Sequence, residues 1–243
     1  MASLTTAAIL IRSVNYKEYD RMITLFSPSV GKIDVLARGC RKPKSPLLNA
    51  CELFATGEYV LYQSKDRYIL TSATIHESFY ALRLDYNVFT QGAYLLNLTE
   101  AAIQPNQPFP DLFRLLIKTL HPLAHEEEKK DSKTILSLFL FHYAQLLGYK
   151  PRLVHCVQCG TKVLPSSPLY FDVVAGGVLC QKCNQQKKCP SLSEEHYRWL
   201  IKALKVGPQN SEQMPKNPPF HLLKEYVEYR LEYPVKASRN LSL

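Results

Sequence analysis

Apolar and polar side chains alternate in several short runs over the first 75 residues. The runs cover residues 7–12, 22–26, 33–37, 58–62 and 68–75, and the second and third are separated by turn residues at 27–31. Alternation with period two between turns is typical of half-buried antiparallel strands. Five short strands predict a small closed barrel, because closure leaves no exposed edge, and both an OB-type and an SH3-like barrel fit this pattern.

From His76 onward the apolar positions recur at steps of three and four, which is the period of a helix with one buried face. The first such stripe comprises Phe79, Leu82, Tyr86, Phe89 and Ala93. Further helices are predicted over 111–120, 132–147, 191–204 and 220–233, with a break at 104–108 and a loop at 207–219. Ser191 and Glu194 have the spacing of a capping box, which favours a helix start there.

The expected fold class is therefore α+β, with a barrel followed by helices. We expect a barrel domain over residues 1–78 and a helical domain over 79–243, with a cysteine-rich module inserted at about 152–190. Two short runs on either side of a glycine turn, 169–174 and 177–179, predict a hairpin inside this module.

Four cysteines in that module have the spacing of metal ligands. Cys156 and Cys159 form one C-x-x-C pair, and Cys180 and Cys183 form a second pair. Two such turns can bring four thiolates around one ion, so the spacing predicts a structural zinc in a zinc-ribbon arrangement. Four thiolates fill the coordination sphere of zinc, which argues against a catalytic metal. Cys189 is a spare residue that could replace a ligand.

Positive charge is concentrated in two parts of the chain. The formal net charge is +9, and residues 1–80 carry 10 basic and 7 acidic side chains, while residues 151–190 carry 5 and 1. A basic surface attracts polyanions such as nucleic acid. Four cations fall in one short segment that also contains Gly and Pro, which predicts an exposed loop that contacts phosphate: Arg38, Arg41, Lys42 and Lys44.

Aromatic residues near this loop could stack on bases. The candidates from the predicted barrel are Tyr16, Tyr19, Tyr59, Tyr62 and Tyr68. Aromatic side chains beside a basic groove are the usual elements of single-strand binding.

The sequence contains none of the common short motifs for catalysis. It lacks G-x-x-x-x-G-K-[ST], H-E-x-x-H and G-x-S-x-G, and its acidic residues form no evident catalytic pair. Arg12 ends the short apolar run at the N-terminus, and the longest uncharged apolar stretch, 135–149, is too short to span a bilayer. We expect a cytoplasmic protein without a membrane segment, with reduced cysteines and no enzymatic activity.

Taken in order along the chain, these residues resemble the RecO family of bacterial DNA recombination and repair mediators. The resemblance depends on Ile9-Leu-Ile-Arg12, Tyr16-Lys-Glu-Tyr-Asp20, Thr24-Leu-Phe26, Gly31-Lys-Ile33, Ala37-Arg-Gly-Cys-Arg-Lys-Pro-Lys-Ser45 and the two cysteine pairs with Gly160, Gly176 and Gly177. These stretches run from about residue 5 to residue 190.

The resemblance implies an N-terminal OB-fold and a helical domain that bears the cysteine module. It implies a protein of the bacterial cytoplasm, associated with the nucleoid, that binds single- and double-stranded DNA and anneals complementary strands. With RecR, such a protein promotes RecA loading on strands coated by single-stranded-DNA-binding protein (SSB), whose C-terminal tail docks on the helical domain. The implied DNA contacts are Arg38, Arg41, Lys42 and Lys44, with Lys32 and Arg21 as further candidates.

Two other classes of protein remain open at this point. A zinc-ribbon protein of transcription or translation that binds RNA or polymerase would share the charge and the metal, and annealing assays with DNA and RNA would separate it. An enzyme would need an open metal position or an acid–base cluster in a cleft.

Overall fold

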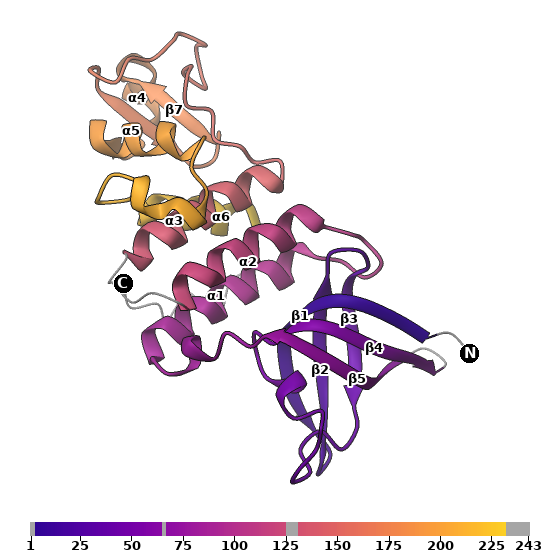
Figure 1. Cartoon of the computed structure of the whole chain (residues 1–243). Helices are drawn as coiled ribbons and strands as arrows, with labels where there is room; N and C mark the ends of the chain where they lie inside the picture. The colour runs from indigo at the N-terminus through magenta and orange to yellow at the C-terminus, as the bar shows by residue number, and fades with distance from the viewer. Residues whose placement is uncertain (1–2, 65–66, 125–130, 232–243) are drawn as a thin grey trace. The chain divides into compact units, whose positions relative to one another are not determined.

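The computed structural model describes residues 3–64, 67–124 and 131–231 (Figure 1). By their packing these residues fall into two compact units, the first ending at Leu120 and the second beginning at His121. The expected domain boundary at residue 78 stays a prediction.

The first unit contains a closed barrel of five strands in the order β1-β2-β3-β5-β4. The strands are β1 (Ser3–Tyr16), β2 (Asp20–Ser27), β3 (Gly31–Ala37), β4 (Thr56–Ser64) and β5 (Arg67–Glu77). All neighbours pair antiparallel except β3 and β5, which run parallel. This topology confirms the OB-type barrel and decides against the SH3-like alternative.

Strand β1 closes the barrel because it pairs with two neighbours. Its first half pairs with β4 and its second half with β2, and a register shift between Leu10 and Arg12 marks the change of partner. Such an irregularity lets one long strand bend around a barrel corner. The inward residues of β2 and β3 follow the predicted alternation, with Ile23, Leu25, Ile33 and Val35 all buried in one core.

Tyr59 is fully buried in this core. Its hydroxyl donates to the carbonyl oxygens of Ala50 and Ala55, at 3.1 and 3.0 Å. The suggestion that Tyr59 stacks on bases is therefore wrong. Its hydroxyl instead holds the segment around η1 (Asn49–Cys51), which connects β3 to β4 along the chain.

The helix expected from residue 79 begins later than its apolar stripe predicts. Strand β5 continues to Glu77, Phe79 adopts the left-handed conformation at φ 45°, and η2 (Tyr80–Arg83) follows. Helix α1 (Tyr86–Ala102) starts where Asp85 caps it, since the Asp85 carboxylate accepts from the amides of Asn87 and Val88. Phe79 and Leu82 are buried before this cap but do not belong to an α-helix, so spacing alone gave the wrong boundary.

The break after α1 holds the barrel and the helices of the first unit together. The amide of Lys32 donates to the carbonyl of Gln104 at 3.2 Å. Helix α2 (Pro110–Ala124) then places Phe113 edge-on against Phe26 of the barrel, with ring centroids 5.5 Å apart. Gly31 lies at φ +84°, and a Cβ there would meet the carbonyl oxygens of Gln104 and Gln107.

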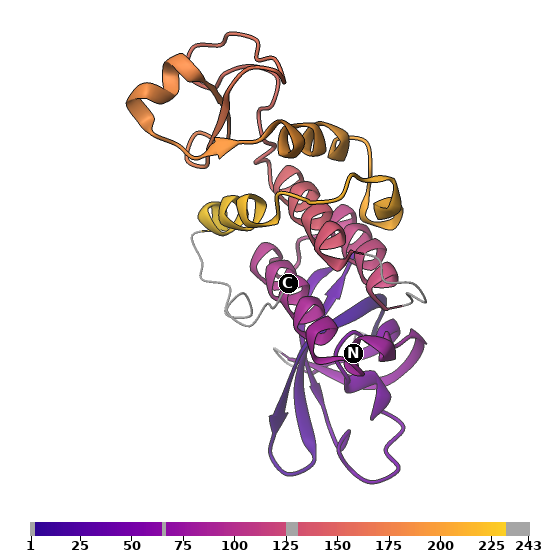
Figure 2. The same cartoon turned by 90° about the vertical axis from the view of Figure 1, so that its left-hand side faces the viewer.

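The second unit contains helices and a small sheet (Figure 2). Its helices are α3 (Ser132–Leu146), α4 (Gln181–Lys187), α5 (Glu194–Ala203), η3 (Pro208–Gln213) and α6 (Phe220–Leu231). The sheet has the order β7-β6-β8, with β6 (Leu169–Asp172), β7 (Gly177–Cys180) and β8 (Ser191–Leu192). The predicted hairpin is confirmed as β6 and β7.

Three details of this unit correct the sequence analysis. Ser191 pairs with Tyr170 in β8, so the predicted capping box is wrong, and Ser193 caps α5 by accepting from the amide of His196 at 3.1 Å. Helix α4 was not predicted. The expected loop at 207–219 contains η3, in which Ser211 is buried. Residues 232 and 233 of the predicted last helix lie outside the described residues.

Candidate nucleic-acid interface and metal centre

The basic loop after β3 is held against the turn between β1 and β2. The amide of Arg41 donates to the Tyr19 carbonyl at 3.0 Å, and the amide of Gly39 donates to the Asp20 carboxylate at 2.8 Å. Gly39 supplies a positive φ of 63°, which a tight turn requires. These bonds give the loop a defined backbone from which its side chains project.

The four cations predicted in this loop are brought together there, and all are exposed: Arg38, Arg41, Lys42 and Lys44. The Arg41 guanidinium donates to the Glu18 carbonyl at 3.0 Å, and the Lys42 ammonium lies 5.8 Å from the centre of the Tyr19 ring. None of the four forms an ion pair with a carboxylate among the described residues. Their charges therefore remain available to an external anion.

Lys32, a further DNA-binding candidate, lies away from the loop and has a carboxylate partner. Its ammonium lies 3.0 Å from Glu100 of α1, and both side chains are about three-quarters buried. Arg12 approaches the same carboxylate at 3.5 Å. This contact joins the barrel to α1 within the first unit.

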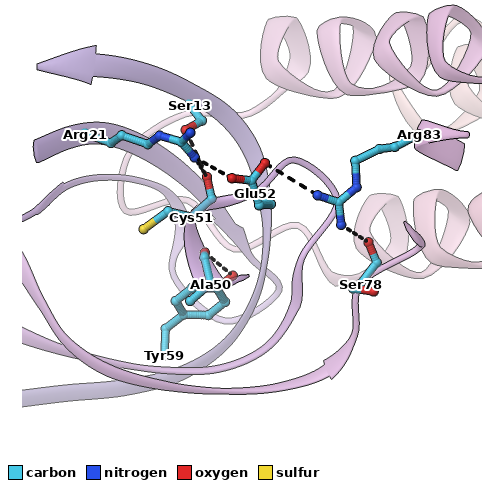
Figure 3. A network of polar contacts seen from close by, with 8 residues as sticks. All are labelled: Ser13, Arg21, Ala50, Cys51, Glu52, Tyr59, Ser78 and Arg83. Carbon is cyan, nitrogen blue, oxygen red and sulfur yellow. Dashed lines mark hydrogen bonds and ion pairs between the residues drawn. The ribbon is translucent and has the colours of Figure 1, made fainter. Parts of the chain in front are cut away.

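Arg21, the other further candidate, lies in a polar network shown in Figure 3. Its guanidinium donates to the Glu52 carboxylate and to the Cys51 carbonyl, each at 2.8 Å. Arg83 approaches the second oxygen of Glu52 at 3.4 Å, and the Ser13 hydroxyl donates to the Cys51 carbonyl at 3.0 Å. The network ties β1, β2, η1 and η2 together. Sequence spacing could not reveal it, because Glu52 is distant from both arginines.

Cys40 and Cys51 are both buried in the core of the barrel. Desolvation and the neighbouring Cys40 raise the pKa of the Cys51 thiol. A buried thiol whose pKa is raised stays protonated and is a poor nucleophile. These two cysteines therefore fill the barrel core.

Two exposed cations outside the predicted binding loop, Lys17 and Arg67, lie near tyrosine side chains. Lys17 has φ 53° and places its ammonium 5.5 Å from the centre of the Tyr16 ring. Arg67 begins β5 and lines a surface hollow together with Tyr16 and Tyr68. The sequence offered one signal for Lys17, its position between two tyrosines of the 16–20 stretch.

The cysteine quartet comes together as predicted. The sulfur atoms of Cys156, Cys159, Cys180 and Cys183 all lie within 4.8 Å of one another. The sulfurs of Cys159 and Cys180 are 3.8 Å apart. Strand β7 and the first turn of α4 supply the second pair, while the turn ending at Gly160, with φ +73°, supplies the first. These four residues could hold one metal ion.

Local hydrogen bonds favour the thiolate at one end of this cluster. The Cys159 sulfur lies 3.3 Å from the Thr161 hydroxyl, and hydrogen bonds from Thr161 lower the pKa of Cys159 to about 6. Desolvation and the neighbouring thiols raise the pKa of Cys183 to about 12. Four sulfurs this close can all be thiolates only beside a cation, which is the chemistry of a metal centre.

The cysteine module also carries exposed positive charge. Lys162, Lys182 and Lys188 are exposed, whereas Lys187 pairs with the buried carboxylate of Asp172 at 2.7 Å. Cys189 lies outside the quartet and exchanges backbone hydrogen bonds with the side chain of Asn184. In the described part of the chain, no other group of His, Cys, Asp and Glu side chains is placed to hold a metal ion. No helix in the same residues is long and apolar enough to cross a membrane.

Comparison with known proteins places this architecture in one family. The family model "Recombination protein O N terminal" matches residues 1–79, and "Recombination protein O C terminal" matches residues 83–239. A DNA repair protein RecO of Acetivibrio thermocellus is 36% identical over 188 residues, which cover 77% of this chain and 73% of the relative. A DNA repair protein RecO of Alkaliphilus metalliredigens is 32% identical over 240 residues and 94% of both chains. The two family models match the barrel and the helices in turn, and this protein therefore belongs to the RecO family.

Proposed function

We propose that this protein is a DNA-binding recombination mediator in DNA repair. The observation that carries the proposal is the loop of four exposed cations, which have no carboxylate partner in the described part of the chain, on an ordered backbone beside an OB barrel. OB barrels commonly bind oligonucleotides on one face and its loops. The name "DNA repair protein RecO", which the relatives carry, supports the same role.

The loop contacts the DNA backbone through Arg38, Arg41, Lys42 and Lys44. Each cation that meets a phosphate releases condensed counterions, and the two arginines add a planar fork that suits phosphate oxygens. Because the loop backbone is already bonded to Tyr19 and Asp20, binding orders little more than side chains. Lys32 and Arg21 contribute less than the loop, since each already has a carboxylate partner.

Annealing of complementary strands follows from charge in both units. Two strands repel each other until their phosphates are screened. The barrel segment 1–80 has three more basic than acidic residues, and the module segment 151–190 has four more. A protein with a basic surface in each unit can screen both strands, and no bond needs to be made or broken. We therefore propose no enzymatic activity.

The cysteine quartet holds one structural zinc ion in this proposal. A tetrahedron with Zn–S bonds of about 2.3 Å has edges of about 3.8 Å. The separation of the Cys159 and Cys180 sulfurs, 3.8 Å, has this length. Four sulfur ligands leave no open position for water, so the ion stabilises a module too small for a core of its own.

The proposed partners are single- and double-stranded DNA, RecR and the C-terminal tail of SSB, with RecA loading as the outcome. The family resemblance supports these partners, and the proposed site of action is the bacterial cytoplasm, at the nucleoid. RNA binding by a zinc-ribbon protein is the competing function. Equal annealing of RNA and DNA strands would favour that alternative.

The salt dependence of binding tests the role of the loop. Changing all four loop cations to Ala should reduce the slope of log K against log[salt] by about 3 on single strands, because each lost phosphate contact contributes about 0.7. Lys42→Ala with Lys44→Ala should reduce it by about half as much. The matched control is Lys118→Ala with Lys216→Ala, two exposed lysines that belong neither to the loop nor to the cysteine module, which should leave the slope unchanged. An unchanged slope in the four-residue variant would refute the loop as the binding site.

A further inference from the structure

A surface hollow lies on the outside of the barrel in the first unit. It has a volume of about 320 Å³ and is lined by Tyr16 of β1, Met22 of β2, Asp34 and Leu36 of β3, and Arg67 and Tyr68 of β5. We infer that this hollow binds one unpaired nucleobase of a single strand, an inference that rests on the proposed DNA-binding function.

The lining suits the face of a planar ring. Tyr16 is 37% exposed, and Tyr68 is half-buried, since it also packs against the barrel core. Met22 and Leu36 add apolar surface between the two rings. Bases stack on aromatic side chains without regard to sequence, because every base has a π-face. The volume is at the low end for ligand pockets, which fits one ring system better than a larger molecule.

The charges around the hollow favour a base over a phosphate as the bound group. The Asp34 carboxylate is part of the lining, and one of its oxygens accepts from the Thr24 hydroxyl at 2.7 Å. A carboxylate in the wall repels phosphate but can accept from the amino group of a base. Arg67 in the lining and Lys17 beside Tyr16 are both exposed and can meet the phosphates on either side of the base.

The hollow is continuous with the basic loop along the chain. Leu36 precedes Arg38 by two residues. Tyr16 leads into the turn whose carbonyl groups, at Glu18 and Tyr19, accept hydrogen bonds from Arg41. A strand whose phosphates lie on the loop therefore passes the hollow within a short length. The loop supplies contacts that any phosphate backbone can make, and the hollow supplies one that only an unstacked base can make.

This assignment predicts a preference for single strands that comes from Tyr16. Replacing Tyr16 by Ala should weaken binding to a single-stranded oligonucleotide about tenfold, within the range for loss of one stacked base. Binding to a duplex should not change, because paired bases stay stacked inside the helix. The salt slope should also be unchanged, since no phosphate contact is lost. Tyr16→Phe should retain full affinity, because it keeps the ring.

The decisive experiment is a fluorescence titration with oligonucleotides that carry one 2-aminopurine. We compare the wild type, Tyr16→Ala, Tyr16→Phe and the control Tyr86→Ala, which removes an exposed tyrosine outside the hollow. The wild type, Tyr16→Phe and the control should change the fluorescence of the base in the same way. Tyr16→Ala should lose this change together with its single-strand affinity. On a strand that lacks bases, all four proteins should bind alike.

Two results would overturn the inference and leave the proposed function intact. One is a Tyr16→Ala variant that binds single strands as tightly as the wild type while the loop variant does not. The other is an equal loss on single strands and duplexes, which would mean that Tyr16 only positions the basic loop. Failure of the wild type to bind any DNA would refute the proposed function itself.

Discussion

Glu52 lies between two arginines, and its contact with Arg21, at 2.8 Å, is the shorter of the two ion pairs. Both side chains of this pair are largely withdrawn from solvent, and the Arg21 guanidinium also donates to the Cys51 carbonyl (Figure 3). The pair joins strand β2 to the η1 segment that follows the basic loop. The ion pair between Arg21 and Glu52 therefore stabilises the part of the barrel to which the basic loop is connected.

Glu52→Gln should destabilise the first unit. The substitution leaves two partly buried guanidinium groups without a counter-charge, which should cost about 2 kcal/mol of unfolding free energy and roughly 4–8 °C of Tm. Differential scanning calorimetry provides the measurement. The control is Glu58→Gln, which removes an exposed carboxylate from β4 and should leave Tm within about 1 °C. Equal Tm values for both variants would contradict a structural role for the network.

Gly31 should tolerate no side chain. At φ +84°, an added Cβ lies 2.7 Å from the Gln104 carbonyl oxygen and meets the Gln107 carbonyl as well, so the backbone must move. Gly31→Ala should lower the free energy of unfolding of the first unit by at least about 3 kcal/mol. Chemical denaturation provides the measurement.

Gly39→Ala is the matched control for this change. Gly39 also has a positive φ, +63°, but an added Cβ there would make only ordinary contacts with Lys42 at 3.7 Å. The control should therefore cost about 1–2 kcal/mol, the strain of the left-handed conformation alone. A Gly31→Ala protein as stable as the control would show that the 104–107 segment does not pack on the barrel.

Removal of the metal should unfold the cysteine module. We expect about one zinc per chain, released by a strong chelator, with loss of the melting transition of the second unit. Cys183→Ser should remove the zinc, since it deletes one of four ligands. Cys189→Ser should retain it, because Cys189 lies outside the quartet. Elemental analysis and calorimetry decide the outcome, and a zinc-free protein that melts normally would contradict it.

Stability of the second unit should fall as the solution is made mildly acidic. The His142 ring nitrogen lies 2.8 Å from the Val206 carbonyl, and burial lowers the pKa of His142 below its usual value of 6.5, although that hydrogen bond opposes the shift. The unfolded chain then binds a proton that the folded chain does not bind, so unfolding becomes easier as pH falls below about 6.5.

Denaturation curves between pH 7.5 and pH 5.5 test this pH dependence. His142→Gln should remove the part of the slope that comes from this residue. His221→Gln, which changes an exposed histidine on α6, should preserve the wild-type slope. A slope that is the same in all three proteins would rule out His142 as its source.

Features encoded locally could be predicted from the sequence. The barrel strands follow from period two, and the cysteine quartet follows from two C-x-x-C turns, since each turn brings two sulfurs together within four residues. The four loop cations lie within seven residues of the chain, so their grouping on one loop could also be predicted.

Features that depend on long-range packing could not be predicted. Helix α4 buries none of its residues, so it has no apolar stripe to detect, and the cysteines at its start position it instead. The helix start predicted at Phe79 is wrong because Phe79 is spaced from Leu82 like two residues on one helical face, although Phe79 adopts the left-handed conformation. The hollow brings Tyr68 beside Leu36 through the parallel pairing of β3 and β5, which leaves no mark in either strand.

The parallel pairing of β3 and β5 affects where the barrel opens by local unfolding. Strands β3 and β5 are joined by two register pairs, Val35 with Tyr68 and Leu36 with Ile69, whereas β2 and β3 share seven. The β3–β5 pairing has the fewest paired residues of the barrel, so local opening should start there and expose its amides to hydrogen exchange earliest. A ligand bound over Leu36 and Tyr68 would contact both strands, stabilise their pairing and slow hydrogen exchange there.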